Sequence, residues 1–150
     1  MIAVIQRVRS SSVSIDGKLR AKVGAGLNIL IGVGDSDGFA DVRALADKIS
    51  NLRIFSDENG KMNLSLIETL GEALIISQFT LLGDCKKGRR PSFIGAAAPA
   101  EAIPLYEAFI AEMEGQIGTQ RVKCGVFGAD MSVEIINDGP VTIILDSKKL

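Results

Sequence analysis

The feature that most restricts the fold is a Gly-Pro pair near the end of the chain, within Asn137–Thr142. It stands between two β-rich runs, Met131–Ile136 and Val141–Leu145, and each run predicts a strand. Proline has no N–H to donate and glycine has no side chain, so the pair does not suit the interior of a regular sheet. We therefore expect a bare corner between two strands, where another molecule can approach main-chain carbonyl oxygens closely.

Strand patterns outnumber helical patterns along the chain. Ala3–Val8 alternates, and Ser12–Ile15 and Lys18–Val23 flank an Asp16-Gly17 pair that favours a tight hairpin turn. Further strands are predicted in three apolar or alternating stretches: Leu27–Val33, Ala73–Phe79 and Arg121–Val126.

Two segments have the apolar spacing of helices. The first runs from Phe39 to Leu52 and follows three possible capping residues, Asp35, Ser36 and Asp37. The second begins near Ala100, and its apolar stripe consists of Ile103, Tyr106, Ile110, Met113 and Ile117. The 150 residues are 47% apolar, which is enough for one core. We predict one α+β domain over residues 1–150, with a mixed or antiparallel sheet curled into a roll or barrel and two helices packed on it.

The chain contains no histidine, which excludes Ser-His-Asp and Cys-His catalysis and every imidazole base. Cys85 and Cys124 form no C-x-x-C pair, so we expect no metal site, and nothing calls for a cofactor. The start of the chain has no signal-peptide pattern and no apolar run is long enough to cross a membrane. We therefore expect a cytoplasmic location, where the cysteines are free thiols.

Three hydrogen-bonding side chains gather within Ser77-Gln78-Phe79-Thr80, at the end of a predicted apolar strand. One interpretation is an ordinary strand end whose hydroxyls satisfy nearby backbone groups. The other is a pocket floor, because backbone N–H groups at such a strand end can stabilise a developing oxyanion. Thr80 is a weak nucleophile without a base, and no histidine exists to serve as one.

A basic loop contains Lys86, Lys87, Arg89 and Arg90, followed by Phe93. Four cations in five residues are typical of a solvated loop, but they can also bind phosphates, and Phe93 offers a face for base stacking. The net charge of −1 argues against a protein that coats nucleic acid by bulk charge. If RNA binds, this loop is the expected contact.

Taken together, these segments resemble the D-aminoacyl-tRNA deacylase family. The likeness runs in order from residue 1 to about 146, and no motif position departs from the pattern. The segments that carry it are Ala3–Val8, Ser77–Leu81, Lys87–Phe93, Phe127–Met131 and Asn137–Thr142.

The resemblance implies hydrolysis of the ester bond in D-aminoacyl-tRNA and in mischarged glycyl-tRNA. It implies a homodimer in which a cis Gly139–Pro140 corner enters the pocket of the other subunit and excludes L-amino acids. The partner is then the 3′ end of aminoacylated tRNA, with neither a membrane nor DNA. The implied catalytic residues are Ser77, Gln78, Phe79 and Thr80, and the substrate-binding residues are Arg7, Met131, Gly139 and Pro140.

Two other functions fit parts of the sequence. A non-catalytic tRNA- or RNA-binding module would use the basic loop and the sheet, although the low net charge counts against it. A small-molecule hydrolase would need Cys85 or Cys124 as nucleophile, activated without histidine. Within the deacylase reading, the sequence leaves open whether Thr80 or the neighbouring ribose hydroxyl assists the attack.

Overall fold

Strand β1 (Ile2–Ile15) is the centre of the sheet in the computed structural model, which describes residues 1–150. It pairs antiparallel with β3 (Gly26–Gly32) along its first half and with β2 (Lys18–Val23) along its second half. Its other edge pairs antiparallel with β8 (Ser132–Asp146) over nearly its full length. Strands β6 (Glu72–Ser77) and β7 (Val122–Cys124) extend the sheet in parallel beyond β3, so the predicted mixed sheet is confirmed.

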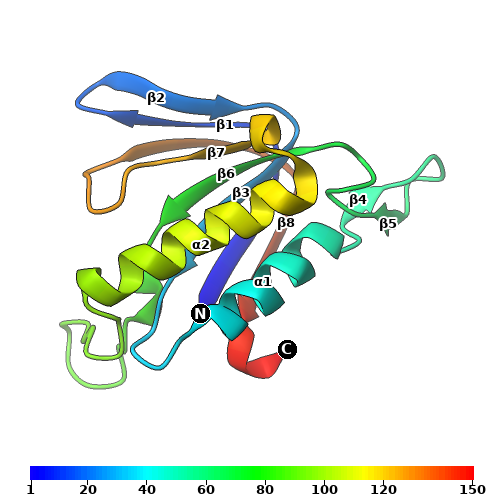
Figure 1. The fold of residues 1–150 in the computed structure, drawn as a ribbon. Helices are drawn as coiled ribbons and strands as arrows, with labels where there is room; N and C mark the ends of the chain where they lie inside the picture. The colour runs from blue at the N-terminus through cyan, green and yellow to red at the C-terminus, as the bar shows by residue number, and fades with distance from the viewer.

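Helices α1 (Phe39–Asn51) and α2 (Pro99–Ile117) cover one face of this sheet (Figure 1). The remaining regular elements are a small hairpin of β4 (Phe55–Ser56) and β5 (Met62–Leu64) and three short 3-10 turns. These turns are η1 (Phe79–Leu82), η2 (Thr119–Arg121) and η3 (Ser147–Lys149).

Both helices bury one stripe against the sheet. In α1 the predicted stripe is confirmed for Val42, Leu45, Ala46 and Ile49, while Phe39 is exposed at the first helical position. In α2 the stripe is rotated from the prediction. Ile103 and Ile110 are only half-buried, and the fully buried positions include several that the pattern left out: Ala102, Leu105 and Phe109.

A second, smaller core lies on the opposite face of the sheet. Val13, Val23, Leu74 and Ile76 form it, while the alternate β6 residue Ile75 points into the main core. Because this core joins residues of β1, β2 and β6, and β3 lies between β1 and β6 in the sheet, the sheet curls around it. The expected α+β fold, a rolled sheet with two helices, is thus confirmed.

The turn chemistry of the first hairpin is as predicted, but two strand boundaries are not. Asp16 and Gly17 both have positive φ, +51° and +72°, as a two-residue type I′ turn requires. Ala3–Val8 and Ser12–Ile15 belong to the single strand β1, because the serines between them continue the pairing with β8. Met131–Ile136 and Val141–Leu145 likewise fall almost entirely within β8, which continues through the Gly-Pro corner.

The helix cap differs from the prediction. Gly38 occupies the N-cap of α1, and its N–H donates to the Asp41 carboxylate (3.0 Å). Asp35 and Ser36 make no side-chain capping bond, and the Asp37 carboxylate accepts from the N–H of Gly34 (2.6 Å) instead. Asp37 is directed away from the helix because it forms an ion pair with the Met1 ammonium.

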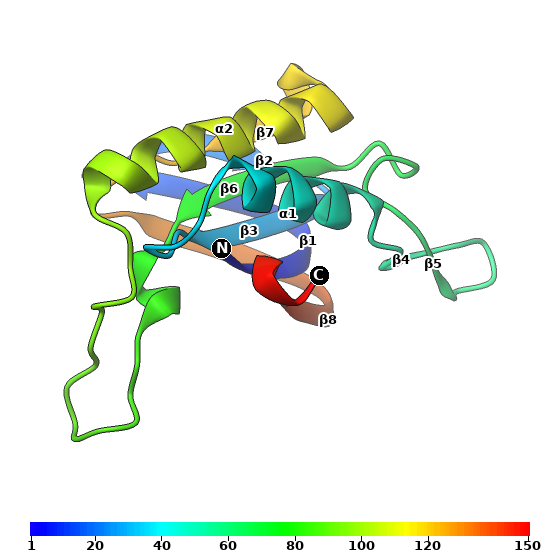
Figure 2. The ribbon, with the colours of Figure 1, turned by 60° about the horizontal axis from the view of Figure 1, so that its bottom comes forward.

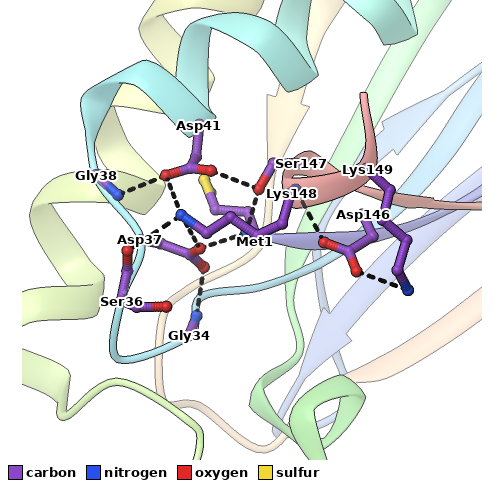
Figure 3. Close-up of polar contacts among 10 residues, drawn as sticks. All are labelled: Met1, Gly34, Ser36, Asp37, Gly38, Asp41, Asp146, Ser147, Lys148 and Lys149. Carbon is purple, nitrogen blue, oxygen red and sulfur yellow. Dashed lines mark hydrogen bonds and ion pairs between the residues drawn. The ribbon is translucent and has the colours of Figure 1, made fainter.

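Asp41 is the hub of a polar cluster that joins both chain ends to α1 (Figure 3). The Met1 ammonium contacts Asp37 and donates to Ser147 Oγ, each at 2.6 Å, and Ser147 donates to Asp41 (2.7 Å). Lys148 Nζ lies 2.7 Å from Asp41. Burial opposes ionisation of Asp41, but the hydrogen bonds from Lys148, Ser147 and Gly38 outweigh it and hold the pKa of that carboxyl well below its ordinary value.

We expect Asp41→Asn to lower the free energy of unfolding at pH 7 by about 2 kcal/mol, because charge-assisted hydrogen bonds are lost. A depressed carboxyl pKa contributes stability that is full above the ordinary carboxyl pKa of about 4 and is lost as the pH falls through the folded value. The variant should therefore differ less from the wild type at pH 3 than at pH 7 in urea unfolding. Asp35→Asn is the control, and an equal deficit at both pH values would contradict this assignment.

Candidate active site

The candidate site begins where the buried strand β6 ends at Ser77. The N–H of Gln78 donates to Ile31 O (2.7 Å), and the chain then tightens into η1. The first bond within that turn runs from Leu81 N to Gln78 O (3.3 Å). The N–H groups of Phe79 and Thr80 precede that bond, so the turn itself does not use them.

A cavity of about 620 Å³ opens beside this strand end. It is mostly apolar, and its walls come from β3, β6, α2 and the loop between β7 and β8. Five residues predicted from the sequence line it: Ser77, Gln78, Phe79, Phe93 and Met131. Its polar side chains include Asp130, which was not among the candidates.

Tyr106 is a second residue of the cavity that sequence reasoning did not select. Its hydroxyl donates to Ile75 O (3.0 Å), and its ring lies 5.8 Å from that of Phe127. Burial raises the pKa of Tyr106 well above its ordinary value, so the phenol remains protonated. In the sequence it is one member of an apolar helix stripe, which predicted packing and gave no signal for a cavity wall.

Thr80 lies beside the cavity and does not line it. Its side chain is exposed, and its hydroxyl oxygen accepts a hydrogen bond from the amide of Gln78. An amide N–H directed at the oxygen is a donor and not a base, so it does not raise the nucleophilicity of the hydroxyl. This contact therefore supplies no base to Thr80.

The Gly-Pro corner is a bulge of β8. Strand pairing holds on either side, at Val8↔Asn137 and Gln6↔Thr142, and residues 138–141 all stand opposite Arg7. The Gly139–Pro140 peptide bond is cis, as the resemblance implied, and both residues are exposed. Gly139 has φ +129°, a conformation that L side chains rarely adopt.

Arg7 holds this corner from within the same chain. Its Nε donates to Asp138 O (3.0 Å), and its Nη1 donates to Ile54 O (2.6 Å). Nε also lies 3.3 Å from the Asp138 carboxylate. Only 9% of Arg7 is exposed, because the corner and the β4 region cover it. Arg7 thus binds the corner through the carbonyl and carboxylate of Asp138 and joins it to the Ile54 carbonyl.

The predicted site residues form two separate groups in a single chain. The strand-end residues and Met131 surround the cavity, whereas Arg7, Gly139 and Pro140 do not line it.

The structure shows no cluster of three or more residues able to hold a metal ion. No helix has the length and apolar character that a membrane span requires.

The four predicted RNA-binding cations lie on a projecting loop, Asp84–Ser92, here called the basic finger (Figure 2). Its base is closed by two backbone hydrogen bonds between Asp84 and Ser92, at 2.8 and 2.9 Å. Phe93 follows directly and meets Phe79 edge to face, with ring centroids 5.1 Å apart. The finger is therefore joined to the rim of the cavity.

Comparison with known proteins agrees with this arrangement. The family model described as D-Tyr-tRNA(Tyr) deacylase matches residues 4–146. Proteins named D-aminoacyl-tRNA deacylase from Cytophaga hutchinsonii and Clostridium beijerinckii are 60% and 56% identical, and each alignment covers at least 98% of both chains.

Solved structures give the same fold. One described as a c-Myc DNA unwinding element binding protein is 38% identical, with a TM-score of 0.93 over 97% of this chain and 98% of its own. A probable eukaryotic D-amino acid tRNA deacylase, 20% identical, has a TM-score of 0.85 over 96% and 97% of the two chains and supports the fold alone. The chain therefore belongs to the D-Tyr-tRNA(Tyr) deacylase family and is a hydrolase that cleaves the ester bond of D-aminoacyl-tRNA.

Proposed function

We propose that the chain removes D-amino acids and glycine from mischarged tRNA in the cytoplasm, as a homodimer with two shared active sites. In each site the cavity of one protomer is closed by the Gly139–Pro140 corner of the other. The observation that carries this proposal is the separation of the two parts: one chain holds an exposed, braced corner and, elsewhere, a cavity that the corner does not line.

The corner distinguishes the two hands of an amino acid by its backbone. Gly139 presents no side chain, so its carbonyl and that of Pro140 can accept hydrogen bonds from an α-ammonium group. With the ammonium held there, the side chain of a D-residue points to solvent and that of an L-residue meets the backbone. Glycine has no Cβ to reject and is cleaved as well. Selection of this kind does not depend on which D-side chain is present.

The chemistry of the ester makes few demands on the protein. In a 3′-linked ester, the neighbouring 2′-hydroxyl of the terminal ribose lies next to the carbonyl that is attacked and can orient or activate water. We assign the N–H groups of Phe79 and Thr80 to the developing oxyanion, a stabilisation of about 3–4 kcal/mol in comparable sites. Gln78, which lines the cavity and donates to Thr80, orients the ribose or adenine.

The alternative that the sequence left open is nucleic-acid binding without hydrolysis. The 38% identical structure that is described as a DNA unwinding element binding protein favours it, as does the basic finger. The cavity at the strand end counts against it, because binding to phosphates alone needs no enclosed, mostly apolar pocket. Binding of tRNA without loss of the ester would support this alternative.

The proposal is tested with one tRNA charged in turn with a D-amino acid, its L-enantiomer and glycine. We expect the D-ester and the glycyl ester to be hydrolysed at least about 100-fold faster than the L-ester, because the L-side chain meets the corner. Release of labelled amino acid measures all three rates. Equal rates on the two enantiomers would remove the corner from the mechanism.

We expect Gly139→Ala to lower D-aminoacyl-tRNA hydrolysis by at least about 100-fold. An added Cβ would lie 2.9 Å from Val141 N and 3.2 Å from Arg7 Nη2, at a φ of +129° that alanine rarely adopts, so the corner must move. Gly115→Ala is the matched control, since open space surrounds its Cβ. An active and still selective Gly139→Ala variant would refute the assignment.

The same variant tests the shared site. Gly139→Ala has a damaged corner and an intact cavity, whereas a variant of the strand end has the reverse. Mixing two such inactive variants should restore about a quarter of the wild-type activity, because half of the dimers are mixed and each has one intact site. No recovery after confirmed subunit exchange would place the corner and the cavity of one site on the same chain.

We expect a tRNA whose terminal ribose lacks the 2′-hydroxyl to be cleaved at least about 100-fold more slowly, because the assisting group is gone. Thr80→Ala should lower turnover by a smaller factor and leave tRNA binding nearly unchanged. Single-turnover rates and equilibrium binding separate the two effects. An unaffected rate on the deoxy substrate, together with an inactive Thr80→Ala variant, would instead make Thr80 the nucleophile.

A further inference from the structure

The basic finger has an unusual charge for this chain. It carries Lys86, Lys87, Arg89 and Arg90 against one acid, Asp84, while the rest of the chain holds more acids than bases. The Asp84 carboxylate accepts from the backbone N–H of Lys86 (2.8 Å), so it shapes the loop. None of the four cations makes an ion pair or a side-chain hydrogen bond within the chain, and all four are exposed.

The finger stands away from the body of the protein in both views of the ribbon (Figures 1 and 2). Its tip therefore adds nothing to the packed cores. Four exposed cations close together repel one another, and a bound polyanion would relieve this repulsion. The finger thus has the electrostatic character of a phosphate-binding element.

An aromatic ledge made of Phe79 and Phe93 connects the finger to the cavity. Phe79 is 56% exposed although its ring packs edge to face on Phe93, and both residues also line the cavity. Gly83 makes this possible, because a Cβ there would lie 3.0 Å from Phe93 Cε1. Solvated aromatic faces between a cationic loop and a pocket are the combination that binds single-stranded nucleic acid.

From this continuity we infer that the basic finger and the aromatic ledge bind the unpaired nucleotides that precede the ester-bearing terminal nucleotide of tRNA. The terminal nucleoside enters the cavity, the next base stacks on the ledge, and the following phosphates contact the four cations. The inference rests on the proposed function, since the ester must lie in the cavity. It assigns to the finger a contribution to tRNA affinity that is separate from the chemistry.

The test compares two substrates with a variant that combines Lys86→Gln, Lys87→Gln, Arg89→Gln and Arg90→Gln. D-aminoacyl-tRNA has the preceding nucleotides, whereas a D-aminoacyl ester of adenosine lacks them. At 50 mM salt the variant's KM for tRNA should rise about 50-fold, and the deficit should close towards 200 mM salt, because four phosphate contacts give a salt slope of about 3. The KM for the adenosine ester should change far less.

A matched control changes four other exposed cations to glutamine: Lys18, Arg20, Lys22 and Lys61. It alters the net charge equally but leaves the finger intact, so it should affect tRNA much less. An equal loss in the control, an equal loss on both substrates, or no loss on tRNA would each overturn the inference. Binding of uncharged tRNA is measured in parallel, because it reports on the finger even if the wild type cleaves neither ester.

The ledge is tested with tRNA that carries 2-aminopurine at the next-to-terminal position. Stacking on Phe93 should quench its fluorescence on binding, and Phe93→Leu should remove the quenching and weaken binding by about 5- to 100-fold. Unchanged quenching in Phe93→Leu would show that this base does not stack on the ledge.

Discussion

The whole arrangement depends on the hydrogen-bonded edges of β1. One edge is used twice, by β3 and then by β2, and the other is used by β8 over nearly the same length. β1 and β8 pair on both sides of residues 138–141, but only Arg7 of β1 stands opposite these four residues. They therefore bulge out of the paired strands. The corner is a consequence of strand pairing, and Arg7 on β1 braces it from directly opposite.

Catalysis without histidine becomes understandable from the same geometry. In the proposed mechanism the strand end supplies main-chain donors, the mostly apolar cavity receives the ester, and the substrate itself carries a hydroxyl beside the bond that breaks. Thr80 accepts a hydrogen bond from the Gln78 amide, and the buried Tyr106 phenol donates one to Ile75 O. On this proposal, positioning and backbone polarity replace the proton transfer that an imidazole performs in other hydrolases.

Sequence patterns predicted what depends on local chemistry. Asp16-Gly17 specified its turn, Val42 to Ile49 specified one helix face, and Ser77–Phe79 together with Met131 identified the cavity. They could not show that Asp37 would be drawn to the Met1 ammonium, leaving Gly38 as the cap, because that contact joins residues brought together only by folding. The role of Tyr106 was hidden for a related reason: burial of a ring in a helix stripe looks the same whether it faces a core or a cavity.

The close approach of Phe93 to Gly83 marks the boundary between the basic finger and the strand end that lines the cavity. Beyond it, the finger is bound only at its base and contributes nothing to the buried cores. Changes in its length or charge would thus leave folding and the strand end undisturbed. If the finger binds tRNA as inferred, its affinity for different tRNAs can evolve independently of the step that removes the amino acid.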